Sequence, residues 1–358
     1  MILIITPFAP PIGGITTWSG TLEKSYQNHP PNYKYIFLDS KTSIGDKVIT
    51  NYLFKFFVVS FRVLLLYFKL LYYQFRYQIS AIHINSSGKL SLLRDFIFVK
   101  SIFGSTNIFI QYHYGEIIQD MNTPAYRFLI ANILKRCKKC FFFDTIAIDT
   151  LKALGYYNVE FLPNGIDLNF LSPTRKQSFQ GFSSKTVLFV GHVIPSKGVF
   201  ELILAANKIE NLKKLIFIGP VSQELKSCLR DLSNGSYEVE FLGLMRREDI
   251  FGIMRSTSVL CLPSYTEGFP YVILEAFANG LPVISTDVGG ISFMLDKGRG
   301  LLCQSKDIVC LSEALDRVLN DLNFRDELVN SITSSARDEF EISSVRKRME
   351  AFWFNTTS

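Results

Sequence analysis

Short apolar runs alternate with longer segments of helical spacing along most of the chain. In the first half, the runs with the length and composition of buried strands are residues 1–7, 33–39, 81–86, 107–113, 140–145 and 159–165. The alternation restarts later with residues 185–193, 214–220, 237–243, 258–264, 282–287 and 299–304. Strands that alternate with helices predict parallel sheets covered by helices on both faces.

A polar stretch at residues 168–185, LNFLSPTRKQSFQGFSSK, separates the two halves and is typical of a linker. We therefore expect a Rossmann-like domain at residues 1–167 and a second one at residues 186–340. The last segment, residues 341–358, has helical spacing, and we expect it to pack back on the first domain. The predicted fold class is α/β, with two doubly wound domains that face a central cleft.

Composition agrees with two ordinary domains. The chain has 358 residues, of which 48% are hydrophobic and 20% charged, so it can bury large cores. Of the six cysteines, only Cys137 and Cys140 form a CxxC pair, and no second pair completes a zinc site. We expect free thiols in a reducing compartment. The N-terminal residues MILIITPFAPP lack the basic region of a signal peptide.

Missing motifs narrow the ligand class. No GxGxxG follows a strand, which argues against a dinucleotide, and no GxxxxGK[ST] is present, which argues against a P-loop. The chain also has no DxD motif, a common means of holding a metal-bound nucleotide sugar. We therefore expect neither a cofactor nor a metal.

The stretch Ser264–Gly290 carries the most informative chemistry. Glu267 lies on a loop after a predicted strand, and Glu275 lies inside the helix that Pro270 opens. An ionised carboxylate only accepts hydrogen bonds, so two such groups suit the hydroxyls of a sugar or a ribose. Alone, both would be read as ordinary surface acids, but the surrounding Gly-Phe-Pro, Gly-Leu-Pro and Gly-Gly favour a binding site.

This stretch resembles the signature of retaining glycosyltransferase family 4, whose GT-B fold has two facing Rossmann-like domains. Other segments resemble family elements in the same order: PIGGITTW at residues 11–18, YHYGE around His113, LPNGID at 162–167 and VGHVIPSKG at 190–198. The resemblance covers nearly the whole chain and is strongest in the second half.

The resemblance implies roles for residues of the second domain. Glu275 would bind the ribose hydroxyls of a nucleoside-diphosphate sugar, and Glu267, with the amides of Gly268 and Phe269, would hold the transferred sugar. Lys197 would neutralise the leaving diphosphate, a role that a positioned cation can fill without a metal. His192 stands where the family has Arg and would contact the diphosphate. Met245 would lie near the base.

In the first domain, the resemblance implies three site residues. Gly13 and Gly14 follow the first strand, and glycine lets backbone amides approach a phosphate or sugar closely. His113 ends the fourth predicted strand and would lie beside the anomeric carbon. The alternatives are a plain tight turn for the glycines and a structural histidine for His113.

The expected function is sugar transfer with retained anomeric configuration. The donor would be a UDP- or GDP-sugar, and the acceptor a lipid-linked saccharide. The expected setting is bacterial surface polysaccharide synthesis, such as lipopolysaccharide, O-antigen or capsule. Two other interpretations stay open. One is a nucleotide-sugar 2-epimerase on the same fold, and the other is a catalytically silent scaffold. A nucleic-acid-binding protein is disfavoured, because no RRM, KH or zinc pattern accompanies the basic residues.

Basic charge is concentrated in one segment. Residues 47–110 contain eight Lys or Arg and a single acid, Asp95. Within residues 52–78, Lys55, Arg62, Lys69 and Arg76 recur every seven residues among aromatic and aliphatic side chains. These charges interrupt any membrane span, and their spacing predicts one stripe along a helix. We expect an interfacial helix on anionic lipid, at the inner face of the plasma membrane, or else an ordinary packed helix.

Overall fold

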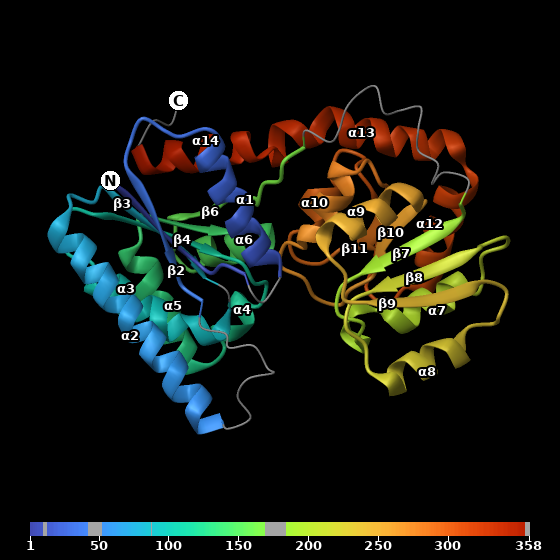
Figure 1. The fold of residues 1–358 in the computed structure, drawn as a ribbon, viewed down its shortest axis with the longest axis horizontal. Coiled ribbons are helices and arrows are strands. Elements are labelled where there is room, and N and C mark those ends of the chain that lie inside the picture. The colour runs from blue at the N-terminus through green and yellow to red at the C-terminus, as the bar shows by residue number, and fades with distance from the viewer. Residues whose placement is uncertain (10–12, 42–51, 87, 169–183, 355–358) are drawn as a thin grey trace. The chain divides into compact units, whose positions relative to one another are not determined.

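A computed structural model describes residues 1–9, 13–41, 52–86, 88–168 and 184–354. The chain divides into two compact units, each with a six-stranded sheet in which every strand pair is parallel (Figure 1). Unit 1 comprises Met1–Gly165 and Ile342–Ser358, and unit 2 comprises Ile166–Glu341. The predicted doubly wound α/β class is confirmed. Most of the expected linker at 168–185 lies outside the described residues.

The sheet of unit 1 has the strand order β2-β1-β3-β4-β5-β6. Its strands are β1 Ile2–Thr6, β2 Tyr35–Asp39, β3 Ala81–Ser86, β4 Asn107–Tyr112, β5 Lys139–Phe142 and β6 Val159–Phe161. Its helices are α1 Gly14–Asn28, α2 Tyr52–Arg76, η1 Lys89–Ser91, α3 Leu92–Ser101, α4 Ile117–Asp120, α5 Pro124–Arg136, α6 Thr145–Ala153 and α14 Ile342–Phe354.

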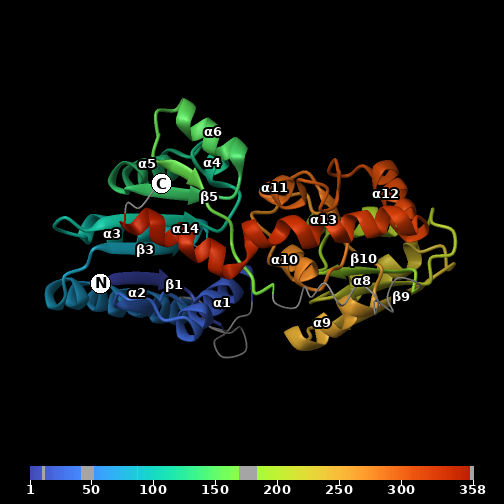
Figure 2. The same ribbon diagram turned by 90° about the horizontal axis from the view of Figure 1, so that it is seen from above.

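Every residue of β1 and β3 is buried, because helices cover both faces of this sheet. On one face, alternate strand residues such as Leu3 and Ile82 join a core with Leu70 of α2 and Phe98 of α3. The other face is covered by α1 and α14, which contact each other (Figures 1 and 2).

Helix α14 brings the end of the chain onto the sheet of unit 1. The indole Nε1 of Trp353 donates to Nδ1 of His83 on β3, at 3.2 Å. One guanidinium nitrogen of Arg346 donates to the carbonyl oxygens of Ser25 and His29, at 3.0 and 2.6 Å. Buried polar contacts of this kind fix the position of the helix as well as its presence.

The sheet of unit 2 has the strand order β12-β11-β10-β7-β8-β9. Its strands are β7 Thr186–Val190, β8 Lys214–Ile218, β9 Glu238–Gly243, β10 Val259–Leu262, β11 Val283–Thr286 and β12 Leu301–Cys303. Its helices are η4 Pro195–Lys197, α7 Val199–Ala206, α8 Gln223–Leu232, α9 Arg247–Ser256, α10 Tyr271–Ala278, α11 Ile291–Leu295, α12 Ile308–Asn320 and α13 Leu322–Phe340.

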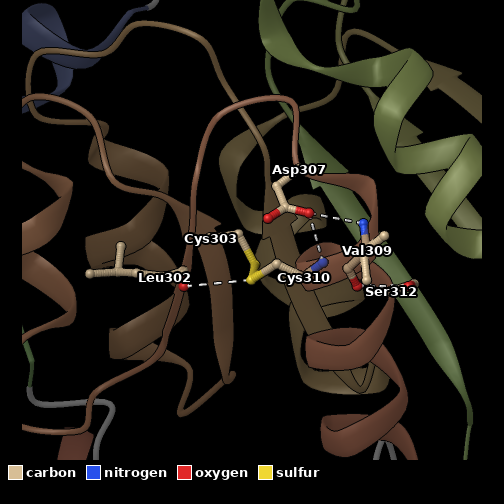
Figure 3. Close-up of a disulfide and its surroundings, with 6 residues drawn as sticks. All are labelled: Leu302, Cys303, Asp307, Val309, Cys310 and Ser312. Atoms are coloured by element: carbon tan, nitrogen blue, oxygen red, sulfur yellow. Dashed lines mark hydrogen bonds between the residues drawn. A yellow bond between two sulfur atoms is a disulfide. The ribbon is translucent and has the colours of Figure 1, made fainter.

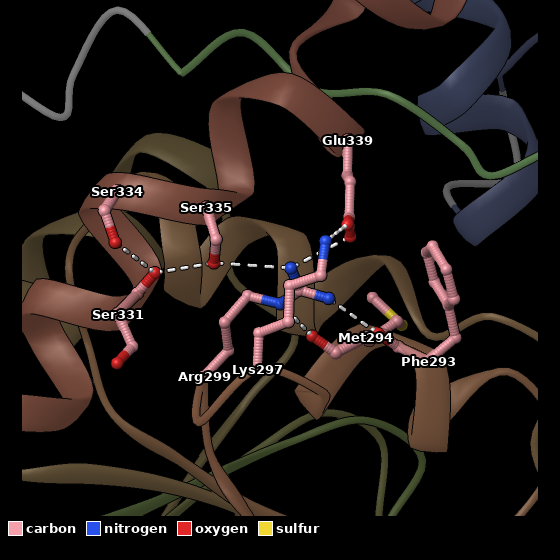
Figure 4. Close-up of polar contacts among 8 residues, drawn as sticks. All are labelled: Phe293, Met294, Lys297, Arg299, Ser331, Ser334, Ser335 and Glu339. Carbon is pink, nitrogen blue, oxygen red and sulfur yellow. Dashed lines mark hydrogen bonds and ion pairs between the residues drawn. The ribbon is translucent and has the colours of Figure 1, made fainter.

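A buried arginine ties α13 to the turn after α11. The Arg299 side chain is fully buried, and its guanidinium donates to the carbonyl oxygens of Phe293 and Met294 (Figure 4). It also forms an ion pair of 2.9 Å with Glu339 on α13, which Lys297 contacts as well. Because the guanidinium is both paired and hydrogen-bonded, its charge is tolerated in the interior.

The expectation of free thiols is wrong for two cysteines. Cys303, at the end of β12, and Cys310, in α12, form a disulfide with a Cα–Cα distance of 5.7 Å (Figure 3). The turn between them is closed by Asp307, whose carboxylate accepts from the amides of Val309 and Cys310. That helix cap brings the two cysteines within bonding distance, which the apolar context of Cys303 in the sequence did not indicate. The other four cysteines are free thiols, and three of them are buried.

Candidate functional site

The loops that carry the predicted donor-binding residues all follow strands of unit 2. Lys197 ends η4, after β7, and Gly198 follows in the left-handed region with φ of 67°. A Cβ on Gly198 would lie 2.0 Å from the carbonyl oxygen of Pro263, at the end of β10. Glycine is therefore required at this position, and it lets the turn carrying Lys197 approach the β10 loop.

Lys197 and Glu267 form an ion pair between the turn after β7 and the loop after β10. The Nζ of Lys197 lies 2.6 Å from Oε1 of Glu267, and the hydroxyl of buried Ser264 donates to the same oxygen at 2.7 Å. The amide of Tyr265 donates to the carbonyl of Ser196 at 2.9 Å, which joins the two loops through the backbone. Both side chains are partly buried, so each offsets the cost of burying the other's charge.

The loop after β11 supports Glu267 from the other side. Gly289 has φ of 56°, and a Cβ there would lie 2.0 Å from the carbonyl oxygen of Glu267. The amide of Gly290 donates to the carbonyl of Gly268 at 2.8 Å, and the hydroxyl of Thr286 donates to the carbonyl of Ser264. Three strand-end loops therefore hold one carboxylate and one ammonium group in a fixed arrangement.

Glu275 lies in α10 and has its own partner. Nε of Arg247, the first residue of α9, donates to Oε1 of Glu275 at 2.7 Å. The guanidinium carbon also lies 5.0 Å from the ring centroid of Phe251 and 5.7 Å from that of Tyr271. Burial raises the pKa of Glu275, and the charge and hydrogen bond of Arg247 oppose that rise.

The remaining predicted residues of unit 2 have varied surroundings. Gly268 and Pro270 are half-buried, and Pro270 caps α10 directly before its first residue, Tyr271. The side chain of Phe269 is buried, with its ring 6.1 Å from that of Phe340, so only its backbone is suited to a ligand. Met245 is half-buried just after β9, and His192 is exposed.

In unit 1, the predicted glycines lie at the start of α1. Gly13 precedes Gly14, the first residue of the helix, and its amide donates to the hydroxyl of Thr16 at 2.9 Å. Gly13 has an extended backbone, and among the residues that the structure describes no non-neighbouring atom lies within 4 Å of a Cβ built there. The local fold therefore does not require glycine at residue 13.

His113 follows β4 and is oriented by Asn85 at the end of β3. Nε2 of His113 lies 2.9 Å from Oδ1 of Asn85, and the imidazole ring packs edge-on against Phe143 at 5.2 Å. As an amide oxygen only accepts, this contact places the proton on Nε2 and leaves Nδ1 as an acceptor. Burial, with a smaller contribution from His83, lowers the pKa of His113 to about 3. The imidazole is therefore neutral at pH 7.

Three supporting residues were not identified in the sequence: Ser264, Arg247 and Asn85. Ser264 is the last residue of the run SVLCLPS, and Arg247 comes four residues after YEVEFLG, so a position at or soon after a strand end was the available signal. Among the residues that the structure describes, no cluster of three or more His, Cys, Asp or Glu side chains could hold a metal ion.

Comparison with known proteins finds a family match in the second half of the chain. Residues 174–335 match the family model "Glycosyl transferases group 1". This segment is similar to glycosyltransferase group 1 domains. The matched segment contains Lys197, Glu267, Glu275 and the loops that hold them.

One curated relative is named for the sugar transfer that it catalyses. A Campylobacter jejuni protein named GalNAc-alpha-(1->4)-GalNAc-alpha-(1->3)-diNAcBac-PP-undecaprenol alpha-1,4-N-acetyl-D-galactosaminyltransferase is 34% identical over 169 residues. The match covers 45% of this chain and 45% of that protein. The chain thus spans about half the length, or less, of the curated relatives it matches.

Solved structures match along nearly the whole chain. Sucrose-phosphate synthase from Thermosynechococcus elongatus is similar with a TM-score of 0.75 and 20% identity, over 99% of this chain and 98% of that one. Anabaena HepE in complex with UDP and glucose is similar with a TM-score of 0.72 and 16% identity, over 99% of both chains. These likenesses confirm the predicted GT-B fold.

Proposed function

We propose that this protein is a retaining glycosyltransferase that moves a sugar from a UDP- or GDP-sugar to a lipid-linked saccharide. The observation that carries the proposal is the Lys197–Glu267 pair, 2.6 Å apart and held by Ser264 inside the matched segment. Two comparisons support the substrate classes. The Campylobacter relative is named for an undecaprenol-linked acceptor, and HepE was solved with UDP and glucose.

Each residue of the pair suits one part of the donor. In the transition state the bond between the anomeric carbon and the diphosphate breaks, and its electrons pass to the leaving oxygen. Lys197 would neutralise that charge, which is the kind of interaction that lowers a barrier most. The ionised Glu267 would accept hydrogen bonds from the sugar hydroxyls, and Glu275, oriented by Arg247, would accept those from the ribose.

The acceptor hydroxyl would attack from the face that the diphosphate leaves, which retains the anomeric configuration. Its oxygen bonds to the anomeric carbon, and its proton passes to an oxygen of the departing diphosphate. We assign Gly13, Gly14 and His113 to the acceptor and the transferred sugar. His113 is suited to accept a sugar hydroxyl at Nδ1, because its proton is on Nε2. His192 and Met245 would contact the diphosphate and the base.

The proposed setting is bacterial surface polysaccharide synthesis, such as lipopolysaccharide, O-antigen or capsule, with the protein peripheral at the inner face of the plasma membrane. Transfer would be independent of metal, since Lys197 can carry the charge that a metal ion otherwise balances.

The test is a thermal-shift screen of UDP, GDP, ADP, CMP and dTDP, followed by transfer from the matching sugar nucleotides to undecaprenol-linked saccharides. A nucleotide present at ~100 times its dissociation constant should stabilise the protein by about 2.7 kcal/mol. Transfer should continue in EDTA, and nuclear magnetic resonance of the product should show the donor's anomeric configuration. Glu267→Gln should lower turnover at least ~100-fold.

Glu224→Gln, which changes an exposed glutamate of α8, is the matched control and should keep full turnover. Loss of transfer in EDTA with recovery in manganese or magnesium would contradict metal independence. An inverted product would rule out the same-face mechanism. Conversion of the sugar nucleotide to its 2-epimer without an acceptor would favour the epimerase interpretation.

A further inference from the structure

Helix α2 exposes an apolar face on unit 1. Phe61, Phe68 and Phe75 are 60%, 57% and 79% exposed, and their seven-residue spacing places them on one side of the helix. The large apolar side chains exposed on this face are Phe57, Phe61, Leu64, Leu65, Phe68, Tyr72 and Phe75. Single exposed apolar residues are ordinary, but a contiguous set on one helix face marks an interaction surface.

The opposite side of α2 belongs to the core of unit 1. Leu66 and Leu70 are buried in the cluster that includes Ile82 and Phe98. Leu66 lies two residues before Phe68, which is about 200° around the helix. The helix therefore packs on the sheet with one side and presents the other side outward. Its position at the outside of unit 1 agrees with this (Figures 1 and 2).

Positive charge borders the apolar face. Arg62, Lys69 and Arg76 are exposed, and each directly follows one of the three phenylalanines, so they form a stripe along one edge of the face. Lys55 belongs to the same repeat, but its side chain lies outside the described residues. Long basic side chains at such an edge can lay their stems on apolar surface while their heads reach a charged partner.

The surface next to α2 has the same character. Leu93 and Ile97 on α3 and Phe103 after it are exposed, and the ring of Phe103 lies 5.2 Å from that of Phe75. The one acid among residues 47–110, Asp95, is fully buried and accepts two hydrogen bonds from Arg94. Folding therefore removes the only acid of this segment from the surface.

We propose that this face of α2, with the adjacent edge of α3, docks unit 1 on an anionic lipid bilayer, with the helix lying along the interface. Charge complementarity selects this occupant, because the basic stripe fits acidic headgroups while the phenylalanines enter the acyl boundary. The proposal rests on the proposed function in one respect: the proposed acceptor is lipid-linked, so docking would place unit 1 at the membrane that holds it.

The helix could also be read as a span. By length and composition, Phe57–Arg76 is the one segment of the described residues that could cross a membrane, and one such helix is weak evidence. Crossing would remove Leu66 and Leu70 from the core and place Lys69 in the hydrocarbon. Lying flat keeps both the core and the charges in their favourable surroundings.

The test is co-sedimentation of the full chain with phosphatidylcholine vesicles, with and without phosphatidylglycerol. The protein should bind only the acidic vesicles, at low salt, and high salt should release it. Each basic residue near an anionic surface strengthens binding about fivefold, so the triple variant Arg62→Gln, Lys69→Gln, Arg76→Gln should bind about a hundredfold more weakly. The matched control, Lys24→Gln, Lys34→Gln, Lys152→Gln, removes three exposed charges of unit 1 from outside this face and should bind as before.

A second pair of variants tests the apolar contribution. Phe61→Ser with Phe68→Ser should weaken binding at least ~10-fold, whereas Val309→Ser with Leu322→Ser, which are 56% and 61% exposed in unit 2, should not. Nucleotide binding, measured without vesicles, should be unchanged in all four variants, so failure of docking and failure of the proposed function are separable.

Several results would overturn the proposal. These are no binding to acidic vesicles at low salt, equal binding to neutral vesicles, or unchanged binding of the basic variant. Retention that only detergent reverses would mean a span. A dimer in sedimentation that Phe61→Ser with Phe68→Ser dissociates would mean that a second copy covers the face.

Discussion

At the scale of single residues, the site depends on charges that are paired before any ligand arrives. Glu275 shows this most clearly, because it is partly buried in α10 and its carboxylate accepts from Arg247 at 2.7 Å. Breaking a partly buried pair costs more than forming it gains, since one charge is left without a partner. Arg247 therefore positions Glu275 and opposes the rise in its pKa that burial causes.

Glu275→Gln should weaken nucleoside diphosphate binding while the fold survives. The amide offers one good acceptor where the carboxylate offers two, and a hydrogen bond to a charged group contributes about 1.5–3 kcal/mol. Titration calorimetry with the nucleotide found in the thermal screen should show affinity about 10- to 150-fold lower. Glu248→Gln, an exposed acid on α9, is the control. Unchanged affinity of Glu275→Gln would remove this residue from the site.

At the scale of elements, the turn between η4 and α7 determines where Lys197 points. Gly198 is in the left-handed region, and its α-carbon faces the carbonyl of Pro263 so closely that no side chain fits. The turn and the β10 loop are therefore coupled through the backbone. A change at this glycine acts on both loops of the Lys197–Glu267 pair.

Gly198→Ala should destabilise unit 2 by at least about 2 kcal/mol, from the left-handed backbone and the steric overlap together. It should also weaken nucleotide binding, because relief of the overlap moves Lys197 away from Glu267. Urea unfolding and calorimetry measure the two effects. Gly252→Ala is the matched control: it lies within α9, and no atom lies within 4 Å of its added Cβ. It should be stabilising by about 0.5–1 kcal/mol. A Gly198→Ala variant as stable as the original would contradict the steric argument.

At the scale of the whole molecule, the chain returns to unit 1 at its end, and a buried histidine meets it there. His83 on β3 is fully buried and accepts from Trp353 of α14. Burial lowers the pKa of His83 to about 4. This histidine must stay neutral for α14 to remain docked, so stability depends on pH.

Unit 1 should lose stability as the pH falls from about 6.5 towards 4. In that window the unfolded chain protonates His83 while the folded chain does not, so the unfolded state binds more protons and gains stability. The loss should approach about 1.4 kcal/mol per pH unit for this group. Urea unfolding followed by tryptophan fluorescence, between pH 7 and pH 4.5, measures it.

His83→Gln should reduce the number of protons taken up on unfolding by up to one in this pH window, even if the variant is less stable at pH 7. His29→Gln, an exposed histidine, should leave the dependence unchanged. An equal slope in His83→Gln would show that His83 is not the group that titrates.

Local patterns of residues predicted the kind of element at each place and which loops carry polar side chains of the site. Apolar runs such as residues 1–7 and 258–264 are local patterns, and they predict strands because alternation with helices leaves few other ways to bury them. The same patterns placed Glu267 after a strand and Glu275 in a helix. These are properties of neighbouring residues, so no distant part of the chain has to be known.

Which of these residues meet depends on the folded arrangement of the chain. Lys197 contacts Glu267 seventy residues away, and Arg247 donates to Glu275 on another helix. Trp353 donates to His83, 270 residues earlier in the chain. Such contacts follow from strand order, register and backbone approach at glycines, which are fixed by packing over the whole sheet. A local pattern of apolar residues identifies a strand, but it does not specify the strand's neighbours.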